Sequence, residues 1–146
     1  MLEKYGHVTS LEYDEECCKF VREKCNLDVI HGSMTELPFD DNRFDLVCAF
    51  DVVEHIEDDN TAINEMKRVM APSGDYFLTV PAFMFLWSEH DEINHHFRRY
   101  TRGNFKSLLT QQEVKPQYIG YFNSLLFIPI ALVRLVQKLL PKSKTK

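Results

Sequence analysis

The sequence has little of what disulfide frameworks and structural zinc sites require. Its 146 residues include four cysteines, at positions 17, 18, 25 and 48, and no two of them have the Cys-x-x-Cys spacing. Cys48 also lies inside an apolar run that we expect to be a strand. Reduced thiols in the cytoplasm are therefore the simpler interpretation.

Signal peptides, internal repeats and low-complexity tracts are absent as well. The N-terminus is charged and polar, without the apolar core of a secretory signal. From Gln117 to Val133, 17 residues carry no charge, which approaches the ~20 apolar residues of a membrane-spanning helix. Asn123, Ser124 and Pro129 interrupt this stretch.

Acidic residues are missing from the C-terminal part of the chain. All 22 Asp and Glu lie at or before Glu113, whereas six of the 17 Lys and Arg follow Val114. The formal net charge of -5 argues against a general nucleic-acid binder, and the basic tail contrasts with an acidic body. With 45% hydrophobic residues the chain can build the core of one domain.

Strands and helices alternate along most of the chain, which predicts an α/β fold with a mostly parallel sheet and crossover helices. The expected strands are Val8–Glu12, Val29–Ile30, Phe44–Phe50, Tyr76–Val80 and Tyr118–Phe122. The first expected helix runs from the cap Asp14 to Asn26. The second begins at Asp58–Asn60, includes Met70 and stops at Pro72–Gly74. The third follows the cap Thr101, and the fourth covers Leu125–Leu140. We expect an α/β domain over residues 1–122 and an apolar, basic helix and tail over residues 123–146.

The run Phe44–Phe50 is the organising element of this prediction. Its apolar character is typical of a strand buried on both faces, and Asp51, Glu54 and His55 follow it directly. Ligands of open α/β sheets bind at the carboxyl ends of the strands. The sequence therefore predicts a functional site at this rim.

Short motifs follow one another along the expected strands and helices. They are Glu12, Gly32–Met34, Leu37–Phe39, Phe44–Val47, Val53–Ile56, Glu65–Val69, Pro72–Gly74 and Val80–Pro81. In these motifs the chain resembles a class I S-adenosylmethionine-dependent methyltransferase of the type 11 or 23 kind. The resemblance implies a Rossmann-like parallel sheet and covers roughly residues 6 to 101. A later run, residues 90–100, resembles the HD…HxRRY loop of some small-molecule methyltransferases.

The resemblance implies a site for S-adenosylmethionine. A carboxylate at a strand end can accept both ribose hydroxyls, so Glu12 is the expected ribose ligand. Tyr13 and Met34 are expected to enclose the adenine, and Ser33 stands where the family usually has an acid. The family passes the methionine part of the cofactor along two more residues, here Phe50 and Asp51.

Acceptor binding is expected at His55 and in the loop Trp87–Tyr100. His55 is the candidate base, because imidazole titrates near neutral pH; alternatively, Glu54 and His55 only orient their segment. The loop is expected to cover the substrate, unless Arg99 and Asp91 merely pin it through a salt bridge. The expected substrate-binding residues are Trp87, His90, Asp91, His96, Arg99 and Tyr100.

No metal site is expected in this loop. His90, Asp91, His95 and His96 are suitable ligand types, but their spacing is not that of a helical pair with a third distant ligand. A metal hydrolase built on the loop is a third functional hypothesis, and it would predict bound zinc.

The glycine-rich GxGxG turn of the resembled family is missing, since Gly6 is followed next by Gly32. In the family, the strand before that turn lies between the strands that correspond to those ending at Glu12 and Phe50. Without it two inner strands lack a hydrogen-bonding neighbour. We expect a fragment, a misplaced start or a degenerate copy; in a complete protein, another chain fills the gap or catalysis is lost.

Two functions remain open from the sequence. The first is methyl transfer from S-adenosylmethionine to a small-molecule acceptor, lipid-linked if the C-terminal segment lies on an anionic membrane. The second is a truncated, non-catalytic relative that binds a partner or membrane through residues 123–146. The alternative for this segment is a last strand and helix that complete the sheet. We expect a cytoplasmic location, with contact to the membrane surface left open, and no nucleic-acid partner.

Overall fold

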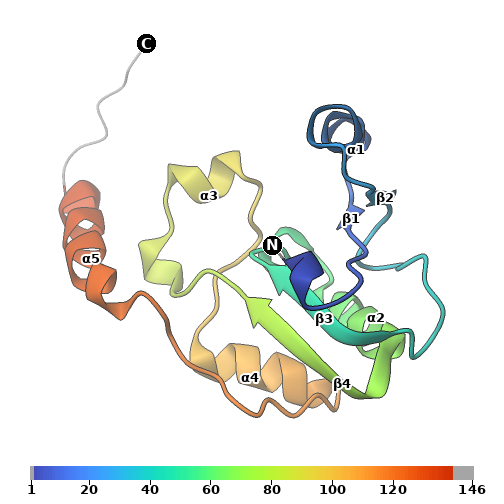
Figure 1. The fold of residues 1–146 in the computed structure, drawn as a ribbon. Helices are drawn as coiled ribbons and strands as arrows, with labels where there is room; N and C mark the ends of the chain where they lie inside the picture. The colour runs from blue at the N-terminus through green and yellow to red at the C-terminus, as the bar shows by residue number, and fades with distance from the viewer. Residues whose placement is uncertain (1, 140–146) are drawn as a thin grey trace. The chain divides into compact units, whose positions relative to one another are not determined.

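The structure, a computed structural model, describes residues 2–139 (Figure 1). The chain forms two compact units. The first comprises the residues up to Val47 together with Asn60–Tyr76, and the second comprises Cys48–Asp59 and the residues from Phe77 onward.

The first unit opens with a short 3-10 turn, η1 (Leu2–Lys4), and a two-stranded parallel sheet. β1 (Leu11–Glu12) pairs with β2 (Ile30–His31), with Leu11 opposite Ile30. β1 is shorter than the predicted Val8–Glu12, since residues 8–10 are not part of the strand. β2 is shifted by one residue from the predicted Val29–Ile30. Their order along the chain agrees with the prediction.

The first helix begins and ends where its capping residues predict. In α1 (Glu15–Phe20) the Asp14 side chain accepts a hydrogen bond from the Cys17 backbone at 2.8 Å. A π-helical turn, η2 (Val21–Cys25), continues α1 and stops at Asn26, which adopts a left-handed φ of 53°. The helix buries Cys18 completely, whereas Cys25 is exposed.

The helix α2 (Asp59–Val69) buries Ala62, Ile63, Met66 and Val69, but it ends earlier than predicted. Met70 was expected on this helix and Pro72–Gly74 as its terminator; both predictions are wrong, because β4 (Met70–Thr79) runs through these residues. A side chain at Gly74 would lie 3.0 Å from the backbone oxygens of Asp45 and Phe44. The glycine therefore permits close contact between the two strands.

The strand β3 (Phe44–Phe50) has the predicted bounds, and β4 is its partner. Backbone N–H groups of Arg43 and Asp51 donate to the carbonyls of Val69 and Thr79, so the two strands run in the same direction. The expected burial on both faces is wrong. Leu46 is 52% and Phe50 48% exposed, because β4 is the only strand beside β3 in residues 2–139.

The second unit continues with short helices after β3. These are η3 (Val53–His55), η4 (Met84–Leu86) and α3 (Glu89–Ile93). The last of them lies within the loop Trp87–Tyr100 that is predicted to cover the substrate, called the lid below. α4 (Arg102–Gln111) then begins at Thr101 in a capping box with Asn104. This helix buries Phe105, Leu108 and Leu109.

The expected strand Tyr118–Phe122 is wrong, since these residues form no ladder. The Tyr121 hydroxyl instead accepts a hydrogen bond from the Arg102 backbone at 2.9 Å, and its ring stacks on Phe83. Side-chain contacts to a helix start and a loop thus replace strand pairing.

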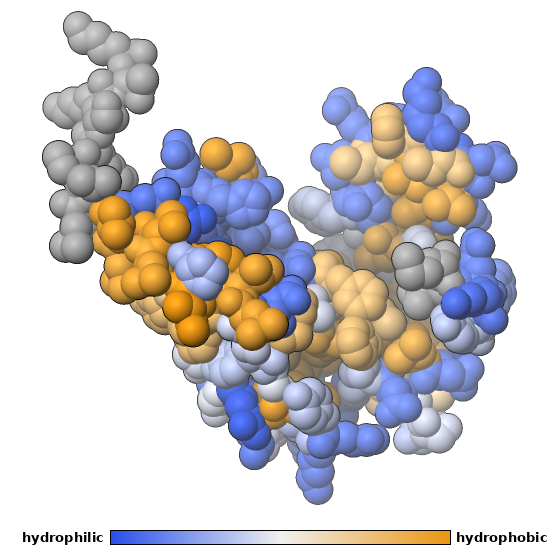
Figure 2. Space-filling model, turned by 60° about the vertical axis from the view of Figure 1, so that its left-hand side comes forward, coloured by the Kyte–Doolittle hydropathy of each residue, from blue (hydrophilic) through white to orange (hydrophobic). Residues whose placement is uncertain are grey.

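The last helix, α5 (Ser124–Leu139), leaves a largely apolar surface uncovered (Figure 2). Phe127 packs against Phe83 and Phe85 near the helix start. No helix among the described residues is long and apolar enough to cross a membrane. The basic residues expected at positions 142, 144 and 146 lie outside the described part of the chain. The exposed large apolar residues of α5 are Leu125, Leu126, Phe127, Ile128, Ile130, Leu132, Val133, Leu135 and Val136.

Candidate active site

The site begins where β3 ends in a strained residue. Asp51 adopts a left-handed φ of 53°, a conformation that costs a non-glycine residue on the order of 1 kcal/mol. Its N–H donates to the Thr79 carbonyl at 3.0 Å, and the Thr79 hydroxyl donates to the Asp51 carboxylate at 3.3 Å. These bonds hold the turn that leads from the strand into η3.

Glu54, in η3, is the most unusual side chain of the second unit. It is completely buried, and neither carboxylate oxygen has a hydrogen-bond partner among the described residues. Burial, with the nearby charges of Asp51 and Asp91 adding to it, raises the pKa of Glu54 to about 7. A buried acid that titrates near neutral pH is typical of functional sites.

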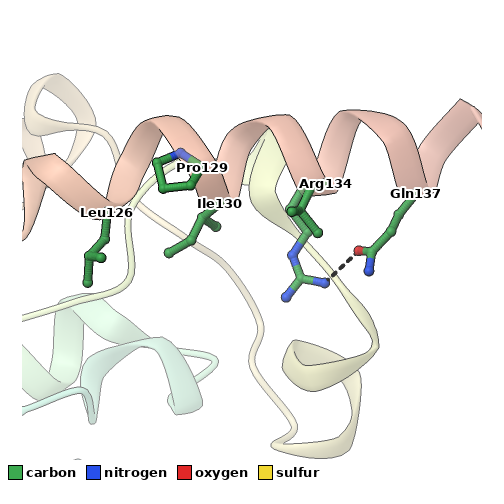
Figure 3. Close-up of a pocket in the computed structure, with 6 residues that line it drawn as sticks. Leu126, Pro129, Ile130, Arg134 and Gln137 are labelled. Atoms are coloured by element: carbon green, nitrogen blue, oxygen red, sulfur yellow. Dashed lines mark hydrogen bonds between the residues drawn. The ribbon is translucent and has the colours of Figure 1, made fainter.

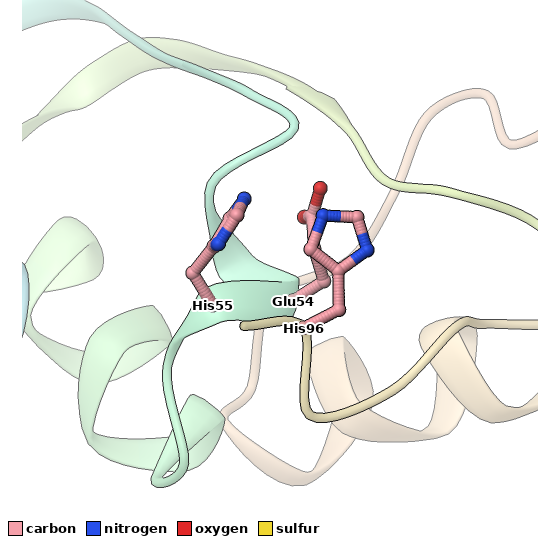
Figure 4. A group of neighbouring side chains, drawn as sticks. All are labelled: Glu54, His55 and His96. Carbon is pink, nitrogen blue, oxygen red and sulfur yellow. The ribbon is translucent and has the colours of Figure 1, made fainter. Parts of the chain in front are cut away.

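Two histidines lie beside this carboxylate. The rings of His55 and His96 pack edge to face with centroids 4.5 Å apart, and His96 comes from the predicted lid (Figure 4). One ligand atom each from Glu54, His55 and His96 lies within 4.8 Å of the others. Burial and the neighbouring His96 lower the pKa of His55, so that its imidazole is neutral at pH 7.

The lid is held by a buried carboxylate. Asp91 accepts two hydrogen bonds from the Arg99 guanidinium, at 2.7 and 3.0 Å, and lies 2.9 Å from Nδ1 of His96. Although burial opposes the charge, the bonds from Arg99, the Ser88 backbone and His96 hold the pKa of Asp91 well below its usual range. The salt bridge that the sequence analysis left open as an alternative is therefore present.

The other predicted substrate residues lie in different environments. The Tyr100 hydroxyl donates to Asp59 at 2.8 Å in the core, which together with burial raises the pKa of Tyr100. Trp87 is half-buried after η4, and His90 is exposed against Asn94. Contact of these three residues with a substrate stays a prediction.

The predicted cofactor residues are divided between the units. The first unit holds Glu12, Tyr13, Ser33 and Met34, and the second holds Phe50 and Asp51. The Glu12 carboxylate accepts a hydrogen bond from the Asp14 backbone at 2.9 Å, so it is turned toward the start of α1. Tyr13 is 76% exposed, which leaves its ring free to cover a flat ligand.

Comparison with known proteins decides the family. A family model described as "Methyltransferase domain" matches residues 1–78, more than half of the chain. The chain belongs to the class I S-adenosylmethionine-dependent methyltransferases. This confirms the predicted family and the predicted α/β fold class.

Relatives of this chain include a demethylmenaquinone methyltransferase of Listeria welshimeri, 40% identical over 75 aligned residues, and the match covers 47% of this chain and 32% of the relative. Among solved structures, a protein of Bacillus halodurans aligns with a TM-score of 0.67 and 17% identity, over 76% of this chain and 55% of that one. The YcgJ protein of Bacillus subtilis aligns with a TM-score of 0.61 and 19% identity, over 87% and 63%. The chain thus spans about a third of the length of the Listeria relative.

From the sequence, Glu54 was predicted to lie at the rim after β3 but was given no binding or catalytic role. The signal was its place in Asp51–His55, directly after an apolar strand. What the pattern does not reveal is that the carboxylate turns inward and finds no partner.

Proposed function

We propose that this protein transfers the methyl group of S-adenosylmethionine to a small, apolar or lipid-linked acceptor. The observation that carries the proposal is the family match over residues 1–78. This range contains all six predicted cofactor residues, from Glu12 to Asp51, and also His55. Methyl transfer is an in-line displacement at the sulfonium, so that positioning supplies most of the rate.

His55 is the proposed proton acceptor in this reaction. A base is needed only when the attacking group is an un-ionised hydroxyl or amine. The lowered pKa of His55 keeps the imidazole neutral and able to accept a proton at pH 7. Because the Asp91–Arg99 pair fixes the lid, the remaining lid residues, Trp87 and His90, are the proposed contacts to the acceptor.

An apolar acceptor is supported by α5. Leu126, Pro129, Ile130 and Val133 line a groove on this helix, with Arg134 and Gln137 at one end (Figure 3). The Arg134 guanidinium donates to Gln137 at 2.9 Å. A helix with an uncovered apolar surface and flanking cations suits the headgroup region of a membrane. The Listeria relative is named for demethylmenaquinone, and we propose that an acceptor of similar apolar character reaches the enzyme at such a surface.

Calorimetric titration with S-adenosylmethionine tests the function. We expect saturable heat with a micromolar Kd, and loss of at least tenfold in affinity in Glu12→Ala because a carboxylate that binds the ribose is removed. The matched control is Glu16→Ala, an exposed acid of α1 outside the predicted site.

Absence of heat with the folded protein would favour the second function, a non-catalytic relative that binds through its C-terminal segment. The specific observation behind this alternative is the uncovered surface of α5. Vesicle binding without cofactor binding would identify it.

A further inference from the structure

Glu54, His55 and His96 form a cluster that methyl transfer does not explain as a whole. They come from η3 and from the lid, two segments far apart in the sequence, and all three belong to the second unit. Of the loop residues for which no metal site was predicted, His90, Asp91, His95 and His96, only His96 belongs to this cluster. The structure brings a different set of ligands together.

Glu54 supplies the first part of the argument. A buried carboxylate normally pairs with a hydrogen-bond donor or a cation. Leaving a buried polar group without a partner costs on the order of 1–3 kcal/mol when the group is neutral and more when it is charged. Glu54 has no hydrogen-bond partner among the described residues. Asp51 and Asp91 add negative charge nearby, which the positive charge of Arg99 offsets only in part. A dication at this point would offset the negative charge of Glu54 and Asp51, since Asp91 is already paired with Arg99.

His96 supplies the second part. Its Nδ1 lies 2.9 Å from the Asp91 carboxylate, and its other ring nitrogen is turned toward Glu54 (Figure 4). Metal-binding histidines usually bond one ring nitrogen to a carboxylate or carbonyl, which fixes the ring and leaves the other nitrogen for the ion. Asp91, itself held by Arg99, therefore orients Nε2 of His96 as a ligand.

We propose that Glu54, His55 and His96 bind a divalent transition-metal ion, with Zn²⁺ as the ion to test. Two imidazoles and one carboxylate are a ligand set that Zn²⁺ accepts, with a remaining coordination position open to water. The ligand atoms lie within 4.8 Å of one another, whereas a tetrahedral ion with bonds of about 2.0–2.2 Å needs separations of roughly 3.5 Å. Side-chain rotations that move the ligand atoms by about 1 Å bring them to this separation.

Ion binding changes one proposed role. The ring nitrogen of His55 that ligates a metal cannot also accept a proton, so His55 would not act as the base through that nitrogen in the metal-bound form. The binding itself does not rest on the proposed function and is measured without methyl transfer.

The test uses the full chain after removal of metals with a chelator. Titration with ZnCl₂ in calorimetry is expected to show one ion per chain. At a free Zn²⁺ concentration of about 100 Kd the unfolding equilibrium constant falls about 100-fold, measured by thermal or urea unfolding. Replacement by Co²⁺ is expected to give the absorption of nitrogen and oxygen ligands without a thiolate charge-transfer band.

Two variants assign the site. Glu54→Gln keeps the shape of the side chain and is expected to fold, and it should lower Zn²⁺ affinity at least tenfold; His96→Ala should do the same. The control is His95→Asn, which removes a neighbouring exposed imidazole at a left-handed φ of 55° that Asn tolerates. No binding by the wild type, a thiolate spectrum with Co²⁺, or unchanged affinity in Glu54→Gln would overturn the proposal.

Discussion

At the residue scale, the lid depends on Asp91. Its carboxylate is fully buried and satisfies Arg99, His96 and the Ser88 backbone. In Asp91→Ala these donors lose their acceptor and the guanidinium stays partly buried. We expect the free energy of unfolding to fall by about 3–5 kcal/mol, as when one partner of a buried ion pair is removed. Urea unfolding measures the change, with exposed Glu92→Ala as the control; a loss below about 1 kcal/mol contradicts the role.

A second residue-scale prediction concerns Glu65 in the first unit. Its carboxylate accepts bonds from Arg68 and from the Leu37 backbone, each at 2.8 Å, and the bond from Arg68 lowers the pKa of Glu65 below 4.5. The folded state therefore binds this proton less readily than the unfolded state. The stabilisation is complete above the unfolded pKa and is lost as the pH falls through the folded pKa.

Glu65→Gln tests this pH dependence, since it keeps one acceptor oxygen and removes the titration. Wild type should exceed the variant in stability by on the order of 1 kcal/mol at pH 7. The difference should shrink below pH 4.5, measured by urea unfolding across the pH range. A difference that stays constant with pH would mean that the Arg68 bond contributes through geometry alone.

At the scale of elements, the sequence predicted those helix and strand bounds that depend on neighbouring residues alone. The bounds of β3, the cap Asp14, the stop at Asn26 and the cap Thr101 follow from apolar runs and capping residues. The prediction of a strand at Tyr118–Phe122 was wrong, because a strand needs a neighbouring strand and the local sequence does not show whether one is present. The same limit applies to the site: its place after β3 was predictable, but the meeting of His55 with His96 depends on tertiary packing.

The element α5 carries a prediction about surfaces. Burying an apolar side chain such as Ile130 contributes about 1.5–3 kcal/mol, so that Ile130→Glu should reduce binding to anionic phospholipid vesicles at least tenfold. Cosedimentation measures the bound fraction. Gln111→Glu, which makes the same charge change on α4, is expected to bind as wild type does. Equal loss in both variants would indicate charge repulsion rather than apolar contact.

At the scale of the whole molecule, the family match covers mainly the first unit, while the lid and α5 belong to the second. A probe that reports on both units is therefore useful, and the four free cysteines provide one. Cys18 is buried in the first unit, and the half-buried Cys48 belongs to the second. Cys17 and Cys25 are exposed.

These environments predict an order of reactivity with a disulfide reagent. Cys25 should react first. Cys17 should follow, because local burial and the Asp14 carboxylate raise its thiol pKa and lower the thiolate fraction. Cys18 and Cys48 should react last, with rates at least tenfold lower than that of Cys25. Cys18 is buried, and burial raises the thiol pKa of Cys48. Mass spectrometry of labelled peptides measures each rate, and urea should make the four rates similar. Fast labelling of Cys18 alone would show that the first unit opens independently, whereas fast labelling of Cys48 alone would show the same for the second, because each thiol is protected by the packing of its own unit.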